Sequence, residues 1–224
     1  MTILALEFSS PQRSIAVVRG RAGGDANVVS EIIETGGNRT PAFALIESVL
    51  REAKLERGQI DVLAVGLGPG SYTGIRIALA LAQGWQLASP GRGLKLIGIS
   101  SAECLAAQAH ADAIRGQVNV VVDAQRSEFY LATYEITETA FEEVEPLQIR
   151  TLEELELRAD GRNIFIGPEV TRWFPDGRLV YPRAAKLGQL ALGRNEFTAA
   201  DKLEPIYLRE TSFVKAPLGK RSYH

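Results

Sequence analysis

The sequence predicts an α/β fold built on a mixed β-sheet, and three observations lead to this prediction. The first is the order of segments in the first hundred residues: three apolar strands, then helix, strand, helix and strand. The second is that helices separate the later strands, which makes those strands parallel, whereas short turns join the first three and make them antiparallel. The third is the composition of the 224 residues, 46% hydrophobic and 23% charged, which is typical of a globular chain that buries a core.

The predicted strands of the first half are short apolar segments bounded by turn residues. Residues 3–8, 14–19 and 28–35 form the first three, separated by a Ser-Pro turn and a glycine-rich turn. Residues 60–66 and 94–99 form two more. Each of these two follows a glycine that is expected to end a helix.

Two helices are predicted between these strands. Apolar residues over 41–57 recur at spacings of three and four, which indicates an amphipathic helix with Thr40 as its N-cap, a proline at its first position and Gly58 at its end. The second helix runs over 71–88 with Ser71 as its N-cap.

The second half has a weaker pattern. Helices are expected over 101–113, 151–157 and 184–192, strands over 118–123, 128–134 and 163–166, and a solvated acidic turn region over 135–145. The element order of the first half is that of the ribonuclease H-like fold and of each lobe of the actin-like ATPases. We therefore expect residues 1–100 to form a first ribonuclease H-like lobe and residues 101–224 a reduced, degenerate actin-like second lobe with a C-terminal segment.

Charge and composition limit the function. Lys and Arg number 25 and Asp and Glu 27, a net charge of −2, whereas a protein that holds nucleic acid on its own basic face usually has a positive excess. The single cysteine, Cys104, excludes an intrachain disulfide. The N-terminus lacks a signal-peptide pattern, and the longest apolar stretch, within 75–88, is too short to span a bilayer. We expect a soluble, cytoplasmic protein without a membrane contact.

A glycine-rich loop joins a strand to the second helix. Gly68, Gly70 and Ser71 stand where backbone N–H groups can hold an anion, but no Lys-Ser/Thr pair follows, so this is not a P-loop. A tight packing turn is favoured over an anion site.

The helix after this loop is apolar on nearly every side. Gly74, Ala78 and Ala82 form a stripe of small residues at a spacing of four. Such a stripe permits close approach of another element, either inside this chain or from another subunit. The sequence leaves both alternatives open.

Catalytic groups are sparse. Glu7 ends the first strand and is followed by Ser9 and Ser10, at the place where related folds hold a metal and phosphate. A second phosphate turn is expected in the other lobe of such folds, but the turn after Asp123 lacks the glycine that this turn requires. A structural role for Glu7 is favoured, and no catalytic or metal-binding residue is predicted. The only candidates for contact with a cofactor are Glu7, Ser9, Ser10, Gly68, Gly70 and Ser71.

Residues 68–77, Gly-Pro-Gly-Ser-Tyr-Thr-Gly-Ile-Arg-Ile, resemble the Gly-Pro-Gly-Ser-Phe-Thr-Gly-Leu-Arg-Ile signature of the TsaB (YeaZ) family. Segments 3–10, 97–101, 122–130 and 205–209 are similar to family segments in the same order, so the resemblance covers essentially the whole chain. Two departures are that Glu7 and Phe8 replace an Asp and a Thr, and that residues 37–40 lack the His-Ser pair of many members.

The resemblance implies a two-lobe actin-like fold and a non-catalytic subunit for threonylcarbamoyl transfer to N6 of adenosine 37 in tRNA. It implies a TsaD paralogue as the catalytic partner and a TsaE ATPase as the third component. ATP and Mg are then used only through these partners, and tRNA is contacted only through the complex. The chain alone is expected to form a homodimer. The implied partner interface lies on the two first-lobe helices, at Phe43, Ile46, Leu50, Gly74, Ile75, Ala78, Leu79 and Ala82. The alternatives are an enzyme acting alone, as an actin-like phosphotransferase or an M22-type peptidase, and, less favoured, a ribonuclease H-type nuclease.

Overall fold

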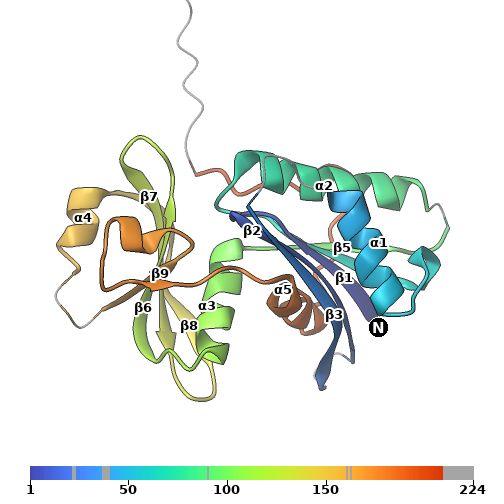
Figure 1. Cartoon of the computed structure of the whole chain (residues 1–224), viewed down its shortest axis with the longest axis horizontal. Coiled ribbons are helices and arrows are strands. Elements are labelled where there is room, and N and C mark those ends of the chain that lie inside the picture. Colours follow the sequence, from blue (N-terminus) through green and yellow to red (C-terminus); the bar gives the residue numbers. More distant parts are fainter. Residues whose placement is uncertain (22–23, 37–40, 90, 160, 162, 209–224) are drawn as a thin grey trace, which may run out of the picture.

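The computed structural model describes residues 1–21, 24–36, 41–89, 91–159, 161 and 163–208, which form two lobes (Figure 1). The first lobe holds a five-stranded sheet of order β3-β2-β1-β4-β5. Its strands are β1 (Thr2–Glu7), β2 (Gln12–Gly20), β3 (Ala26–Thr35), β4 (Val62–Gly66) and β5 (Lys95–Ile99). β1 pairs with β2 antiparallel and with β4 parallel, which confirms the predicted mixed sheet.

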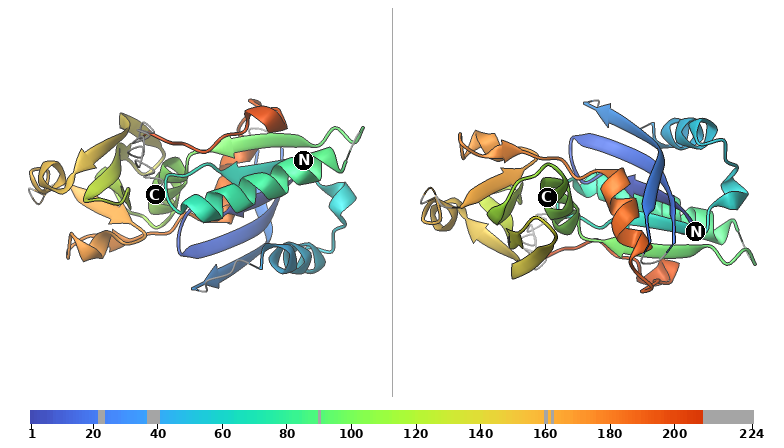
Figure 2. Two further views of the ribbon diagram at one scale, coloured as in Figure 1. Left: turned by 90° about the horizontal axis from the view of Figure 1, so that it is seen from above. Right: turned by 90° about the horizontal axis from the view of Figure 1, so that it is seen from below.

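Helices cover both faces of this sheet. α1 (Ala42–Glu52) and α2 (Tyr72–Leu87) pack on one face, and α5 (Ala184–Leu192) packs on the other. Figure 2 shows α2 across the sheet in the view from above and α5 in the view from below. The central strands β1 and β4 are buried on both faces, as their unbroken apolar sequences require.

The first helix is shorter than predicted. α1 ends at Glu52 because the chain turns at Lys54, which has a φ of +54°, and Gly58 lies instead in a 3-10 turn, η1 (Arg57–Gln59). Pro41 occupies the N-cap position, and Thr40, the predicted cap, lies outside the described residues. The amphipathic spacing itself stops at Ala53, the C-cap, and the predicted end at 57 was too late because it relied on Gly58 as the helix stop.

The second helix begins as predicted. Ser71 is the N-cap of α2, and its Oγ accepts a hydrogen bond from the Gly74 N–H at 3.2 Å. Replacing Ser71 with alanine leaves this N–H without its partner and should lower the free energy of unfolding by about 1 kcal/mol. Urea titration measures this change. An unchanged midpoint together with lost phosphate binding would instead indicate an anion site.

The second lobe repeats the strand arrangement of the first. Its sheet has the order β10-β9-β6-β7-β8, with β6 antiparallel to β7 and parallel to β9. The strands are β6 (Gly116–Asp123), β7 (Glu128–Ile136), β8 (Phe141–Thr151), β9 (Ile164–Gly167) and β10 (Arg178–Leu179). The counterpart of α1 is the five-residue α4 (Leu152–Glu156), and that of α2 is a 3-10 turn, η2 (Val170–Arg172). α3 (Ser101–Ala111) packs on the opposite face of the sheet.

One acidic segment was assigned wrongly from the sequence. Residues 135–145 were expected to be a solvated turn region, but β7 extends to Ile136 and β8 begins at Phe141. The acidic side chains lie on an edge strand with solvent on one side, which allows charged residues within a strand.

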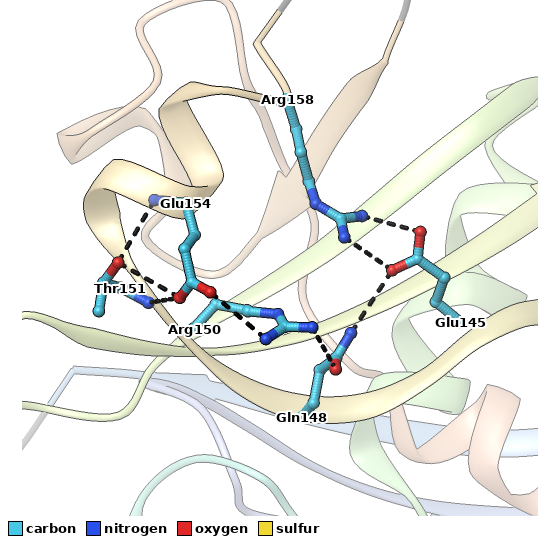
Figure 3. A network of polar contacts seen from close by, with 6 residues as sticks. All are labelled: Glu145, Gln148, Arg150, Thr151, Glu154 and Arg158. Atoms are coloured by element: carbon cyan, nitrogen blue, oxygen red, sulfur yellow. Dashed lines mark hydrogen bonds and ion pairs between the residues drawn. The ribbon is translucent and has the colours of Figure 1, made fainter.

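A network of ion pairs and hydrogen bonds joins β8 to α4 (Figure 3). Arg158 donates to both carboxylate oxygens of Glu145 at 2.9 and 2.8 Å, and this lowers the pKa of Glu145. Thr151 and Glu154 form the capping box that begins α4, in agreement with the predicted cap. The network therefore holds the short helix in place.

The chain returns to the first lobe after β10. Leu203 belongs to the core under α2, the Gln83 side chain donates to the carbonyl groups of Ala200 and Leu203, and Ile206 N–H donates to Leu67 O. The expected second lobe over 101–224 is therefore wrong for α5 and for this segment, which includes η3 (Ala200–Lys202). Arg209, the last residue of the family-like segment 205–209, lies outside the described residues.

Among the described residues, no helix has the length and apolar character needed to cross a membrane.

Candidate functional site

A cleft of about 960 Å³ lies between the two lobes, where β1 and β6 end. Four predicted candidates line it: Ser9, Ser10, Gly70 and Ser71. The other two, Glu7 and Gly68, are buried beneath this surface. The second lobe contributes the turn after β6 and the region around η2.

Glu7 is fully buried and joins three elements. Its Oε1 accepts from the Ser9 N–H at 2.8 Å, and its Oε2 accepts from the Ser101 hydroxyl at 3.0 Å. The same Ser101 Oγ accepts from the Gly68 N–H at 3.2 Å. Burial raises the pKa of Glu7, and these hydrogen bonds oppose the increase. The carboxylate therefore fastens β1 to the glycine loop and α3, a structural role.

Replacing Glu7 with glutamine should weaken the pH dependence of stability. Because the folded-state pKa of Glu7 is raised, its contribution is fully present below the unfolded pKa and is lost as pH rises through the folded value. Glutamine keeps an acceptor for Ser9 and does not ionise. Urea unfolding of both proteins from pH 4 upward should show the wild type losing stability relative to Glu7→Gln, and parallel curves would contradict this.

The glycine loop is held by backbone contacts. Ser71 N–H donates to Ser9 O at 2.7 Å, and Ser101 N–H donates to Gly68 O at 2.7 Å. Gly70 has a φ of +143°, and a Cβ added there would overlap the Ser9 carbonyl oxygen. These contacts agree with a tight packing turn.

The turns that hold phosphate in actin-like proteins have several of their donors occupied here. In the first lobe, the Ser9 N–H is bound to Glu7, the Ser10 hydroxyl donates to Gln12 O at 2.7 Å, and Pro11 has no N–H. Few donors are left on this side of the cleft for a polyphosphate.

The second-lobe turn is closed in the same way. Ala124 N–H donates to Glu128 O at 2.9 Å, and Gln125 N–H donates to the Asp123 carboxylate at 2.7 Å. The Asp123 carboxylate is thereby engaged by its own turn. Among the described residues, no three His, Cys, Asp or Glu side chains are grouped to hold a metal ion.

The cysteine does not form a nucleophile–base pair with the nearest histidine. Cys104 is buried, burial raises the pKa of its thiol, and its Sγ donates to Arg183 O at 3.3 Å. His110 lies beside Phe141, with ring centroids 6.0 Å apart, at the other end of α3.

The predicted partner stripe faces the core of the chain itself. Ile46, Leu50, Gly74, Ile75, Ala78, Leu79 and Ala82 are buried, and of the eight expected interface residues only Phe43 is exposed, at 68%. A Cβ at Gly74 would overlap the Phe8 carbonyl oxygen, which shows how closely α2 approaches β1. The intrachain alternative is therefore correct for this stripe.

A second set of small and apolar residues lies on the outer face of α2. Ala80, Gly84 and Ala88 are exposed, and a Cβ at Gly84 would meet nothing within 4 Å. Leu87 is 77% exposed beside them. We call Ala80, Gly84, Leu87 and Ala88 the outer face. Its spacing of four is visible in the sequence, but we assigned partner contact to the other stripe.

Tyr207, in the segment 205–209 that is similar to the family, lies at the rim of the cleft. Tyr207 stacks on Tyr72 at the start of α2, with ring centroids 5.9 Å apart and an interplanar angle of 30°. The Arg76 guanidinium lies 5.1 Å from the centre of the Tyr72 ring and donates to its hydroxyl at 2.9 Å. Sequence analysis assigned no role to these residues.

Comparison with known proteins gives one family and several relatives. The family described as TsaD, tRNA N6-adenosine threonylcarbamoyltransferase, matches residues 41–196. The Escherichia coli tRNA threonylcarbamoyladenosine biosynthesis protein TsaB is 27% identical over 98% of this chain and 100% of its own length. The Bacillus subtilis protein of the same description is 31% identical over 66% of this chain and 61% of its own.

Solved structures agree with the fold. YeaZ from Pseudomonas aeruginosa has a TM-score of 0.76 at 23% identity, covering 92% of this chain and 99% of its own. At this identity the match speaks for the fold alone, and it confirms the predicted two-lobe architecture.

Proposed function

Because this chain belongs to the family of TsaD, tRNA N6-adenosine threonylcarbamoyltransferase, we propose that it acts in the biosynthesis of threonylcarbamoyladenosine in tRNA as a TsaB-type, non-catalytic subunit. The non-catalytic role is supported by the hydrogen bonds of the polar groups that lie in and beneath the cleft. The acidic residue at the end of β1 is buried and holds β1 to the glycine loop and α3, and each phosphate turn binds donors of its own. Transfer therefore takes place on a partner subunit.

The partner is a TsaD-type catalytic subunit that docks on the outer face. Small residues on α2 let a partner helix approach closely, and Leu87 supplies a large exposed apolar side chain beside them. A second copy of this chain uses the same face when the partner is absent, so the homodimer and the heterodimer exclude each other. A TsaE-type ATPase completes the assembly.

Reconstitution tests this function. The chain is mixed with the TsaD-type and TsaE-type proteins of its own organism, tRNA, ATP, magnesium, bicarbonate and labelled threonine. Label should enter tRNA only when this chain is present with its partners. Unchanged labelling when the chain is omitted would overturn the proposal, as would peptide cleavage or phosphotransfer by the purified chain alone.

The isolated chain, without its partner subunits, should not bind Mg-ATP tightly. Several donors of the two turns, including the N–H groups of Ser9, Ala124 and Gln125, are already bonded within the chain, so their use by a polyphosphate would require breaking those contacts. Isothermal titration calorimetry should show no saturable heat at micromolar protein. A micromolar Kd would show that the turns open and that ATP chemistry belongs to this chain.

A further inference from the structure

Aromatic rings from both lobes line the cleft, and the proposed function does not use them. Tyr72 and Tyr207 stack at one side, and each keeps about half of its surface exposed, 58% and 49%. Tyr130 and Trp173 of the second lobe line the same cleft. Burial, and then the nearby Tyr72, raise the pKa of Tyr207.

The charged groups favour a base over a polyphosphate. Asp123 and Glu169 line the cleft together with Arg13 and Arg126, so the cleft has no excess of positive charge to hold several phosphate charges. A carboxylate has about four acceptor sites, and the Asp123 contacts within its own turn use two of them, so an exocyclic amino group can still donate to it. Arg126 is an exposed residue of the cleft lining, and the guanidinium of the exposed Arg76 lies over the Tyr72 ring.

We propose that this cleft binds a nucleobase from a single-stranded segment of RNA, stacked on the aromatic rings. Aromatic side chains with arginines at the edge of a groove are the usual means of holding unpaired bases. The base enters the cleft, and its phosphates stay outside near Arg76 and Arg126. The choice of RNA over a free nucleotide rests on the proposed function, since tRNA is the substrate of the complex.

Tryptophan fluorescence gives a direct test on the isolated chain. The chain has two tryptophans, and Trp85→Phe leaves Trp173, which lines the cleft, as the only one. This protein is titrated with a tRNA anticodon stem-loop, with AMP and with Mg-ATP at low salt. The stem-loop should quench Trp173 fluorescence, and AMP and Mg-ATP should bind more weakly than the stem-loop.

Variants separate stacking from charge. In the Trp85→Phe background, Tyr207→Ala should weaken stem-loop binding about tenfold or more, whereas Tyr207→Phe, which keeps the ring, should bind nearly normally. Arg126→Gln should weaken binding and reduce its salt dependence, with Arg19→Gln, exposed and outside the cleft, as its matched control. Circular dichroism verifies that each variant is folded. If Tyr207→Ala proves unstable, Arg126→Gln still tests the site, because Arg126 is exposed on a surface turn.

Three results would overturn the inference. These are no quenching by the stem-loop, AMP or Mg-ATP binding as tight as the stem-loop, and binding that neither Tyr207→Ala nor Arg126→Gln changes. Association with the TsaD-type subunit is measured separately, so failure of the cleft site leaves the proposed function standing. Failure of the reconstitution likewise leaves the quenching result to be judged by itself.

Discussion

Replacing Gly84 with glutamate should abolish association with the TsaD-type subunit while leaving the chain folded. Gly84 is exposed at the middle of the outer face, and open space surrounds the position of its missing Cβ. In the free chain the carboxylate stays in water, and glutamate is a better helix former than glycine. In the complex it would be buried without a partner, at a cost of about 3–5 kcal/mol, which lowers affinity more than a hundredfold.

The matched control for this variant lies two residues away on the opposite face. Ala82 is fully buried against the sheet, so Ala82→Glu should unfold the chain instead of only blocking association. Surface plasmon resonance with the TsaD-type subunit and circular dichroism distinguish the two results. If Gly84→Glu remains folded and binds normally, the outer face is not the interface.

Replacing Gly74 with alanine should destabilise the chain by about 3 kcal/mol or more. The added methyl group would overlap the Phe8 carbonyl oxygen, which belongs to the backbone just after β1. α2 must then shift away from the central strands, and its neighbours in the core lose contacts.

The same substitution at Gly84 should have the opposite sign. Nothing lies within 4 Å of the new Cβ there, so Gly84→Ala should stabilise the helix by about 0.5–1 kcal/mol. Urea unfolding of the two variants gives the comparison. Equal midpoints would contradict the close approach of α2 to β1.

Several features follow from the sequence because they depend on neighbours along the chain. Unbroken apolar segments specify β1 and β4, the amphipathic spacing specifies α1, and side-chain caps specify where α2 and α4 begin. The same reasoning led to the first sheet, because three turn-linked strands followed by alternating helices and strands permit few arrangements. The glycine loop was also understood correctly as a tight turn.

The tertiary structure decided the matters that depend on residues far apart in sequence. α2 has small residues on two faces, and only its fit against Phe8 and the sheet shows that Gly74 faces inward and Gly84 outward. α5 is amphipathic wherever it packs, and it lies on the first sheet because that sheet has an uncovered apolar face. Tyr72, Tyr130, Trp173 and Tyr207 are far apart in the sequence, and their rings come together in one cleft only when the lobes assemble. Local periodicity shows which side chains avoid water, whereas the element that covers them is selected by packing over the whole chain.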